Sequence, residues 1–445
     1  MKVIWIVLVL FAGISAVGCE RDEKPAENRV KIMYGGTERQ FFTQYGNYFV
    51  AKFPEMDVEI ISTEGMPPWP EEGKEYEKRM NAEKPDIVML SSSTYTELSA
   101  KGVLLDLAPL IQRDRFDVDN IAPAVITTLS STGNGGKLYG LGTHFTSSVL
   151  LYNKDLFKLY GVAEPEGSLS WEQLYAIMRH FSVTTVSREP VYGYHRPFMI
   201  NPFSYVQEVA NSGGLTLVNT STREITIRTE GWRKAFQLVA DGILGGSLGG
   251  GYRVSKGNVE QADTKNADLF GQGKAAMTIG NFQSVSNLLA TPPAFDWGIA
   301  GAPASQPAEG MSQSMDVYPI FGIYAKADHV ESAWRVVQYL NSDEVARINS
   351  GLKTGVLPVR FQYAPDLGGR EVELFYRVAS NSLSNARILT DYLTLPAAFR
   401  GVMGSIINEE FDKVLTGKAT VDEALKRMQE REQAALDSAG AAEAK

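Results

Sequence analysis

The chain has 445 residues, of which 44% are hydrophobic and 21% are charged, and its formal net charge is −9. These proportions are ordinary for a globular protein, but the length exceeds what one hydrophobic core usually supports, so two lobes are expected. Phosphate groups and anionic lipids are bound by dense clusters of Lys and Arg, which this acidic sequence lacks, so nucleic acid and anionic membrane surfaces are excluded as binding partners.

The first 18 residues have the pattern of a signal peptide. Lys2 precedes a short apolar run, which small residues follow before Cys19. A helix that spans a bilayer needs roughly 20 apolar residues, and this run is shorter. Ser-Ala-Val-Gly-Cys resembles a bacterial lipobox, and the only cysteine of the chain is therefore expected to carry a lipid. Residues 19–28 are charged and are expected to form a flexible tether.

From Arg29 onward, a short apolar run, a polar turn and a helical stretch follow one another three times. The apolar runs are residues 30–34, 58–61 and 86–90. Strands that alternate with helical segments indicate βαβ units and a parallel sheet, hence an α/β fold. Ligands of such sheets bind at the carboxyl ends of the strands, where the three polar turns should meet.

The later chain is predicted to be mostly helical. The spacing of apolar residues predicts helices over 154–160, 170–178 and 231–239, and Ser170 with Gln173 predicts a capping box. Strands are expected at 275–280, 296–300 and 318–324. Helices are expected at 329–340, 343–348 and 421–431, and residues 439–445 are expected to fray. Trp171, Trp232 and Trp334 are expected in the core.

Several site motifs fail in their context. His144, His180, His195 and His329 show neither the spacing nor the cysteine neighbours of a zinc site, and no metal or other cofactor is expected. Neither glycine-lysine stretch, 133–137 or 271–274, has the spacing of a phosphate-binding loop. The sequence Gly-Gly-Ser-Leu-Gly around Ser247 matches the nucleophile elbow of hydrolases, but an amphipathic helix precedes it where a strand is required.

Several stretches in order resemble the family 1 extracellular solute-binding proteins of ABC importers, the maltose-binding-protein-like group. Residues 85–90 and 98–109 resemble that family's third strand and the helix after it, and 137–141 with 149–157 resemble its interlobe crossing. Residues 170–174 and 269–282 resemble two further family motifs, including Phe-Gly-Gln-Gly-Lys-Ala-Ala-Met. Gly142 stands where the family usually has proline, and Phe282 stands near a usual tryptophan.

The resemblance implies a periplasmic-binding-protein type II fold. Each lobe would be a mixed β-sheet flanked by helices, with a ligand cleft and a hinge between the lobes. On this basis residues 29–143 and 275–317 are assigned to the N-terminal lobe, residues 144–274 and 318–435 to the C-terminal lobe, and residues 436–445 to a frayed tail. Strands near residues 146–149, Gly280 and Tyr318 are expected to absorb lobe closure.

Sugar sites combine polar groups with aromatic rings, because sugars present hydroxyls at their edges and C–H groups on their faces. Candidates are therefore polar or aromatic residues at strand ends and at the crossing. They are Thr37, Glu38, Trp69, Ser92, Ser93, Tyr95, His144, Phe145, Phe203, Tyr205, Phe282, Asp316 and Tyr318. A structural role for His144, and a surface ring clamped by prolines for Trp69, remain alternatives.

The sequence thus predicts a lipid-anchored, monomeric solute-binding protein on the outer face of a bacterial cell membrane. It would capture a mono- or oligosaccharide and deliver it to the permease of an ABC transporter with its ATPase, without catalysis. Two alternatives stay open. One is a secreted hydrolase that uses Ser247, with Asp316 or Asp328 and His329, or a carboxylate pair. The other is a receptor that presents a bound sugar to a signalling partner in the membrane.

Overall fold

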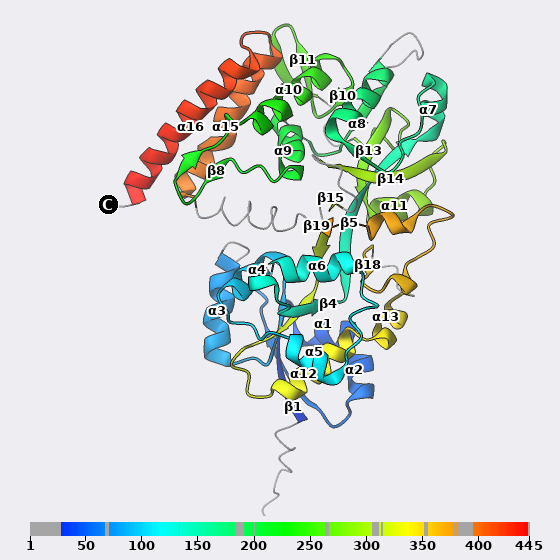
Figure 1. Ribbon diagram of the computed structural model, residues 1–445, viewed down its shortest axis with the longest axis vertical. Helices are drawn as coiled ribbons and strands as arrows, with labels where there is room; N and C mark the ends of the chain where they lie inside the picture. The colour runs from blue at the N-terminus through cyan, green and yellow to red at the C-terminus, as the bar shows by residue number, and fades with distance from the viewer. Residues whose placement is uncertain are drawn as a thin grey trace, which may run out of the picture.

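The chain forms two α/β lobes that follow one another along the long axis of the molecule, joined by β5 (His144–Asn153) and its neighbours (Figure 1). The predicted two-lobed α/β class is therefore confirmed. This computed structural model describes residues 28–66, 71–132, 134–182, 191–199, 201–262, 267–304, 311–312, 315–350, 355–377, 379–380 and 395–443. The predicted signal peptide, Cys19 and Trp69 lie outside the described residues.

The first lobe is built on a five-stranded mixed sheet in the order β2-β1-β3-β17-β4. β1 (Arg29–Tyr34) runs parallel to β2 (Asp57–Ser62) and to β3 (Ile87–Leu90), which confirms the predicted βαβ units. β17 (Ile320–Ile323) comes late in the chain and lies antiparallel between β3 and β4 (Gly140–Gly142). The helices of this lobe are α1 (Glu38–Phe41), α2 (Asn47–Lys52), α3 (Glu71–Glu83), α4 (Ser92–Ala100), α5 (Ala108–Asp114), α6 (Pro123–Thr132), α12 (Val330–Leu340) and α13 (Asp343–Ser350).

The second lobe is built on the sheet β10-β7-β13-β5-β14-β6, which two further short strands join at β5. These strands are β6 (Ser168–Ser170), β7 (Tyr192–His195), β10 (Leu248–Gly249), β13 (Ala275–Asn281), β14 (Trp297–Ala304), β16 (Met315–Val317) and β18 (Leu357–Pro358). Its helices are α7 (Lys154–Tyr160), α8 (Trp171–Met178), α9 (Pro202–Ser212), α10 (Glu230–Leu244), α11 (Phe282–Ala290), α15 (Ala397–Leu415) and α16 (Val421–Glu443). Two-residue or four-residue strands pair outside the main sheets as β8 (Val218–Asn219) with β9 (Glu224–Ile225), β11 (Tyr252–Ser255) with β12 (Asn258–Gln261), and β15 (Met311–Ser312) with β19 (Ala379–Ser380).

The predicted division of the chain between the lobes is wrong for the two late segments. β13 and β14 lie on either side of β5 in the second sheet, although residues 275–317 were expected in the first lobe. β17 pairs with β3 and β4 in the first sheet, although residues 318–435 were expected in the second lobe. The chain therefore returns to the first lobe only after β16, because β17 fills the position between β3 and β4.

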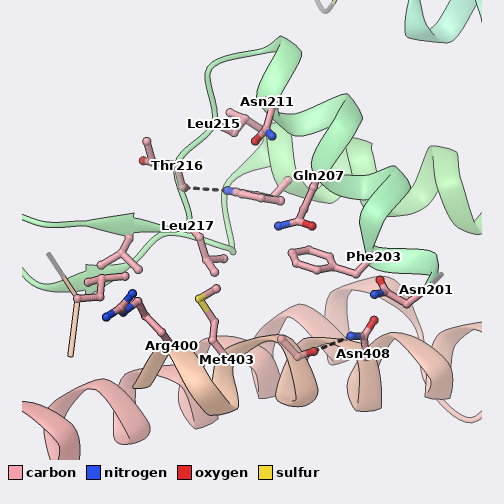
Figure 2. Close-up of a pocket in the computed structure, with 14 residues that line it drawn as sticks. Asn201, Phe203, Gln207, Asn211, Leu215, Thr216, Leu217, Arg400, Met403 and Asn408 are labelled. Carbon is pink, nitrogen blue, oxygen red and sulfur yellow. Dashed lines mark hydrogen bonds between the residues drawn. The ribbon is translucent and has the colours of Figure 1, made fainter. Parts of the chain in front are cut away.

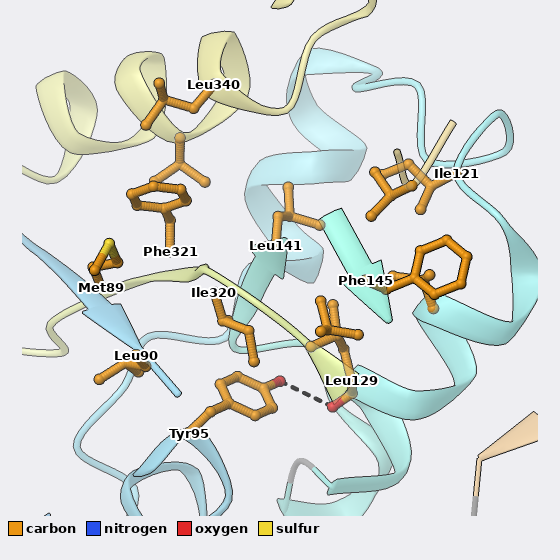
Figure 3. Packing of buried hydrophobic residues seen from close by; sticks show 14 of the residues in the cluster. Met89, Leu90, Tyr95, Ile121, Leu129, Leu141, Phe145, Ile320, Phe321 and Leu340 are labelled. Atoms are coloured by element: carbon orange, nitrogen blue, oxygen red, sulfur yellow. Dashed lines mark hydrogen bonds between the residues drawn. The ribbon is translucent and has the colours of Figure 1, made fainter. Parts of the chain in front are cut away.

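The cores of the two lobes contain the aromatic residues that the sequence assigned to them. Trp334 is fully buried in the first core, and Trp171 and Trp232 are buried in the second. Figure 3 shows the first core where β17 and β4 meet: Phe321 and Leu141 lie on one side of the sheet, and Ile320 lies on the other side, near Tyr95. The predicted capping box of Ser170 with Gln173 at the start of α8 is confirmed.

The predicted frayed tail is also corrected, because α16 continues to Glu443. Leu436 is fully buried and Ala439 nearly so, and both belong to the second core. Burial of these apolar side chains against the rest of the lobe holds the last turns of the helix in place. Among the helices of the described residues, none is both long and apolar enough to cross a bilayer.

Gly142, at the end of β4, is explained by a close approach to the strand that leads into the first lobe. A Cβ atom at this position would lie 2.3 Å from Val317 Cγ1 and 3.3 Å from the carbonyl oxygen of Pro319. Gly142 is paired with Ile320, so the two chain segments that cross between the lobes are in contact here. Glycine thus lets the crossing strands pack closely where the family usually has proline.

Gly142→Ala should destabilise the fold, because Val317 is β-branched and buried and cannot move its methyl group away freely. We expect the free energy of unfolding to fall by about 1–3 kcal/mol, the usual cost of overpacking, as measured by urea denaturation. Gly401→Ala is the matched control, since nothing lies within 4 Å of its position in α15. This control should raise stability by up to about 1 kcal/mol. Equal unfolding midpoints for Gly142→Ala and the wild type would contradict the contact.

Candidate functional site

The strands that join the lobes are β5 and its partners β13, β16 and β18, and together they form a ribbon with one polar and one packed face. Along β5, Phe145, Ser147 and Val149 are buried, whereas His144, Thr146 and Ser148 are partly accessible. Side chains of directly paired residues lie on the same face of a sheet. Asp316 pairs with Thr146 and Asn281 pairs with Ser148, and both Asp316 and Asn281 are exposed. The accessible face of the ribbon is therefore polar, and it lies at the junction of the two lobes.

Asp316 ties this face to the carboxyl end of β3. The hydroxyl of Ser92, at the start of α4, donates to the Asp316 carboxylate and lies 3.1 Å from the carbonyl oxygen of Val317. Asp316 is accessible to solvent, yet enough protein surrounds it to raise the pKa of its carboxyl by desolvation, against the opposing hydrogen bond from Ser92. A carboxylate that is both accessible and crowded lies in a concave surface, as a ligand site requires.

Tyr318 ties the ribbon to the carboxyl end of β1. Its backbone N–H donates to the carbonyl of His144 at 3.1 Å. Its side chain is 49% exposed, and its hydroxyl would lie 3.9 Å from a Cβ atom at Gly35. The pKa of Tyr34 is raised by burial and by the nearby Tyr318. The two predicted residues Asp316 and Tyr318 therefore stand beside the turns that follow β3 and β1.

A cavity of 580 Å³ lies between the lobes next to the ribbon. Its walls come from α11 of the second lobe, from the end of α13, and from the segment 355–367 that packs on the first core. His144 and Phe282, both predicted site residues, line it, together with Asn287, Asn349 and Asp366. The Phe282 ring is buried to 8% exposure and meets the edge of Phe375 at 6.2 Å. The lining thus combines amide, carboxylate and aromatic groups.

His144 is neutral in this environment. Burial lowers the pKa of its imidazole to about 4, and Nδ1 lies 3.0 Å from the hydroxyl of Thr143. A neutral imidazole has one nitrogen that donates and one that accepts a hydrogen bond. His144 can therefore offer a hydrogen bond to a neutral polar ligand at physiological pH.

A second pocket, of 420 Å³, lies wholly within the second lobe (Figure 2). It is enclosed by the start of α9, the segment before β8, and α15, and Figure 2 shows Phe203 and Met403 on its opposite walls. The Phe203 ring is 4% exposed and stacks on Trp232 and Phe236. Gln207 and Asn211 add amide groups to the lining of this pocket. The helix that carries them, α9, lies on the side of the second lobe that is nearer to the first lobe (Figure 1).

Three predicted site residues are structural instead. Tyr95 is 1% exposed, donates to the carbonyl of Leu129 at 2.9 Å and accepts from the backbone of Tyr139 at 3.1 Å (Figure 3). Phe145 is 1% exposed and points to the packed face of the ribbon, against Tyr376. Tyr205 is 2% exposed, and its hydroxyl bonds the backbone of Gly249 and Arg196. These predictions are corrected, because the rings and hydroxyls already have partners inside the protein.

The remaining predicted residues of the first lobe lie at strand ends in various roles. Thr37 caps α1, since its hydroxyl accepts the N–H of Gln40 at 3.2 Å. Glu38 is exposed in the first turn of the same helix. Ser93 is half-buried, 3.0 Å from the hydroxyl of Ser91. Thr146, Ser148 and Asn281 were missed. Residues 146, 147 and 148 are all polar, so only the structure shows that Thr146 and Ser148 are accessible and that Ser147 is buried.

The proposed hydrolase triad is not assembled. Ser247 is fully buried next to the end of α10, with its hydroxyl 3.3 Å from the carbonyl of Gly242. His329 instead lies in the first lobe, where Nδ1 is 3.2 Å from Asp86 Oδ2. Across the part of the chain that the structure describes, no group of His, Cys, Asp and Glu side chains could hold a metal ion.

The geometry defines a two-lobed ligand-binding protein, with accessible polar groups where its lobes meet. The family model of the bacterial extracellular solute-binding proteins matches residues 35–347. The chain therefore belongs to this family.

Named relatives agree with this assignment. An arabinooligosaccharide-binding protein of Bacillus subtilis (strain 168) is 27% identical over 180 residues, which span 39% of this chain and only 40% of that relative. The sugar-binding protein MalE of Xanthomonas citri has a TM-score of 0.62 at 18% identity, over 92% of this chain and 98% of that one. A sugar transporter protein of Rhizobium etli in an open conformation has a TM-score of 0.59 at 15% identity, over 91% and 99%. The solved structures show a shared fold.

Acidification from pH 6.5 to pH 4 should destabilise the ligand-free protein in part through His144. The folded state holds the pKa of His144 at about 4, below its ordinary value of 6.5, so the unfolded state binds more protons in this window and stability falls with pH. His144→Gln should show a shallower loss of stability over this range in urea denaturation at several pH values. His180→Gln replaces an exposed ring and should follow the wild-type curve. A His144→Gln curve parallel to the wild type would contradict the assignment.

Proposed function

We propose that this protein is an extracytoplasmic solute-binding protein that captures a mono- or oligosaccharide between its lobes and delivers it to the permease of an ABC transporter. The observation that carries the proposal is the accessible polar face of the interlobe ribbon, where Thr146, Ser148, Asn281 and Asp316 stand together. Hydroxyl, amide and carboxylate groups are complementary to the hydroxyls of a sugar. Family membership and the sugar ligands named for its relatives support the same conclusion.

Aromatic rings around the polar face add the second feature that sugars require. Tyr318 presents a ring that is 49% exposed beside the end of β1, and Phe282 lines the interlobe cavity. Aromatic faces pack against the C–H groups of a sugar ring, while the polar groups bond its hydroxyls. The cavity of 580 Å³ falls within the usual range for small-ligand sites.

Capture would proceed by closure of the lobes about the ribbon. β5, the β16–β17 segment and the end of β13 are the described connections that run along the junction. Small backbone changes near residues 146–149, Gly280 and Tyr318 would rotate one lobe toward the other. Closure would bring α9 and α11 of the second lobe nearer to Ser92 and Tyr318 of the first. No bond is made or broken, so the protein is not an enzyme.

Attachment to the membrane would be through a lipid on Cys19, with the folded chain acting as a monomer outside the cytoplasm. The extracellular character of the family supports this location. A receptor that presents a bound sugar to a signalling partner would use the same site. Co-purification of the membrane partner would distinguish the two roles, because a transporter brings permease and ATPase subunits and a receptor does not.

A panel of sugars should identify the ligand class by thermal shift. Glucose, arabinose, maltose, maltotriose, arabinotriose and cycloalternan would each be added to the purified protein at increasing concentration. A bound sugar at about 100 times its dissociation constant should add roughly 2.7 kcal/mol to stability. For a protein of this size, such a gain is several degrees in melting temperature. No shift with any sugar or related polyol would refute carbohydrate capture.

Asp316→Asn should weaken the binding of the sugar found in that panel while leaving the fold intact. Hydrogen bonds to a charged group contribute about 1.5–3 kcal/mol, so affinity should fall about ten- to hundredfold in isothermal titration calorimetry. Asp328→Asn is the control, because Asp328 is also exposed but lies before α12, near the amino end of β3. Equal affinities for Asp316→Asn and the wild type would remove the carboxylate from the site.

A further inference from the structure

Phe198 combines two unfavourable features that rarely occur in one residue. Its side chain is 72% exposed, the largest fraction among the exposed large apolar residues of the described chain. Its backbone has a φ of +66°, in the left-handed region that bulky residues avoid. The other described non-glycine residues with positive φ are all lysines or arginines. Exposure of an aromatic ring and backbone strain both cost stability. A residue that combines the two is therefore a candidate for a functional role.

The turn that carries Phe198 lies at the ligand edge of the second lobe. It directly follows β7, which runs parallel to β13 with Tyr194 opposite Met277. β13 ends at Asn281, which is paired with Ser148 on the polar face of the ribbon. The carboxyl ends of parallel strands share one edge of a sheet, and ligands of α/β folds bind at that edge. Phe198 therefore lies at the same edge of the sheet as the polar face.

Hydrogen bonds and one ion pair hold this turn on both sides. Before Phe198, the N–H of Arg196 donates to Tyr205 Oη at 3.0 Å, and the Arg196 guanidinium is paired with Glu208. After it, the carbonyl of Met199 accepts the N–H of Gly251 at 3.1 Å. Glu208 is 8% exposed and also accepts from Tyr194 Oη at 3.0 Å. The strained conformation is thus imposed by its surroundings, and the ring is held out into solvent.

We propose that Phe198 is an aromatic platform for the bound sugar, packing against its C–H face when the lobes close. This inference rests on the proposed function. The ring stands at the edge of the sheet that ends at the polar face, and α9, which begins just after this turn, carries Phe203 into the pocket of Figure 2. Rigid exposed rings contribute stacking at little conformational cost, which favours a small ligand with an apolar face.

Three substitutions of Phe198, with one control substitution elsewhere, test the platform by measuring stability and binding separately. Phe198→Gly should raise the melting temperature, because glycine adopts a φ of +66° without strain. The same change should weaken binding of the sugar with the largest shift in the panel, such as maltotriose or arabinotriose, about three- to tenfold in isothermal titration calorimetry. Phe198→Ala should weaken binding similarly, and Phe198→Tyr should retain wild-type affinity. Leu244→Ala, at an exposed apolar position at the end of α10, should leave affinity unchanged.

The outcomes distinguish this inference from the proposed function. If the wild type binds a sugar and Phe198→Gly and Phe198→Ala bind it equally well, the platform is refuted and the proposed function stands. A loss of sugar import in cells with unchanged affinity would likewise refute it, and would assign Phe198 to contact with the permease. If no sugar binds the wild type, both fall together. Higher stability with weaker binding in Phe198→Gly supports the platform, because a merely structural residue would not move the two quantities in opposite directions.

Discussion

One strand, β5, is shared by both lobes, and the alternation of buried and accessible side chains along its first half is the constraint on which the rest of the structure depends. Its first residues pair with β16 and β18, and its later residues pair with β13 and β14. Phe145, Ser147 and Val149 face the packed side, where burial of apolar surface holds the lobes together. The opposite face cannot be apolar without exposing a hydrophobic patch to water, and it is polar. The proposed binding surface is thus the face of these strands that lies opposite to the packed side.

The neighbourhood of Asp316 is where groups of both lobes contribute to the proposed site. The carboxylate lies on the ribbon, but its hydrogen-bond donor, Ser92, begins the helix after β3 of the first sheet. Tyr318, two residues further, stands over the end of β1. These contacts place groups from three distant parts of the chain within one concave surface. Polar groups held in this way lose little conformational entropy when they bind a ligand, which favours recognition of a neutral, multiply hydroxylated molecule.

Much of the local structure followed from the sequence, and much of the site did not. The three βαβ strands, the capping box of α8 and the buried tryptophans were predicted, because they depend on periodicity and short-range hydrogen bonds. The sequence did not predict that β13 and β14 join the second sheet and β17 the first. A short apolar run does not reveal which strand it will pair with. Tyr95, Phe145 and Tyr205 were chosen for their chemistry, yet each is enclosed by segments far away in the chain. Phe198 was overlooked, because strain and exposure have no sequence signature.

The sequence by itself determined the α/β class, the likeness to extracellular solute-binding proteins, and the polar character of the segment that crosses between the lobes. These properties reside in residue types and their spacing. Only the tertiary structure decided which side chains of that segment are accessible at the junction of the lobes, and which lobe each late strand joins. The physical reason is that strand register and partner choice arise from long-range hydrogen bonds and packing. A shift of one residue would have reversed every side chain on β5.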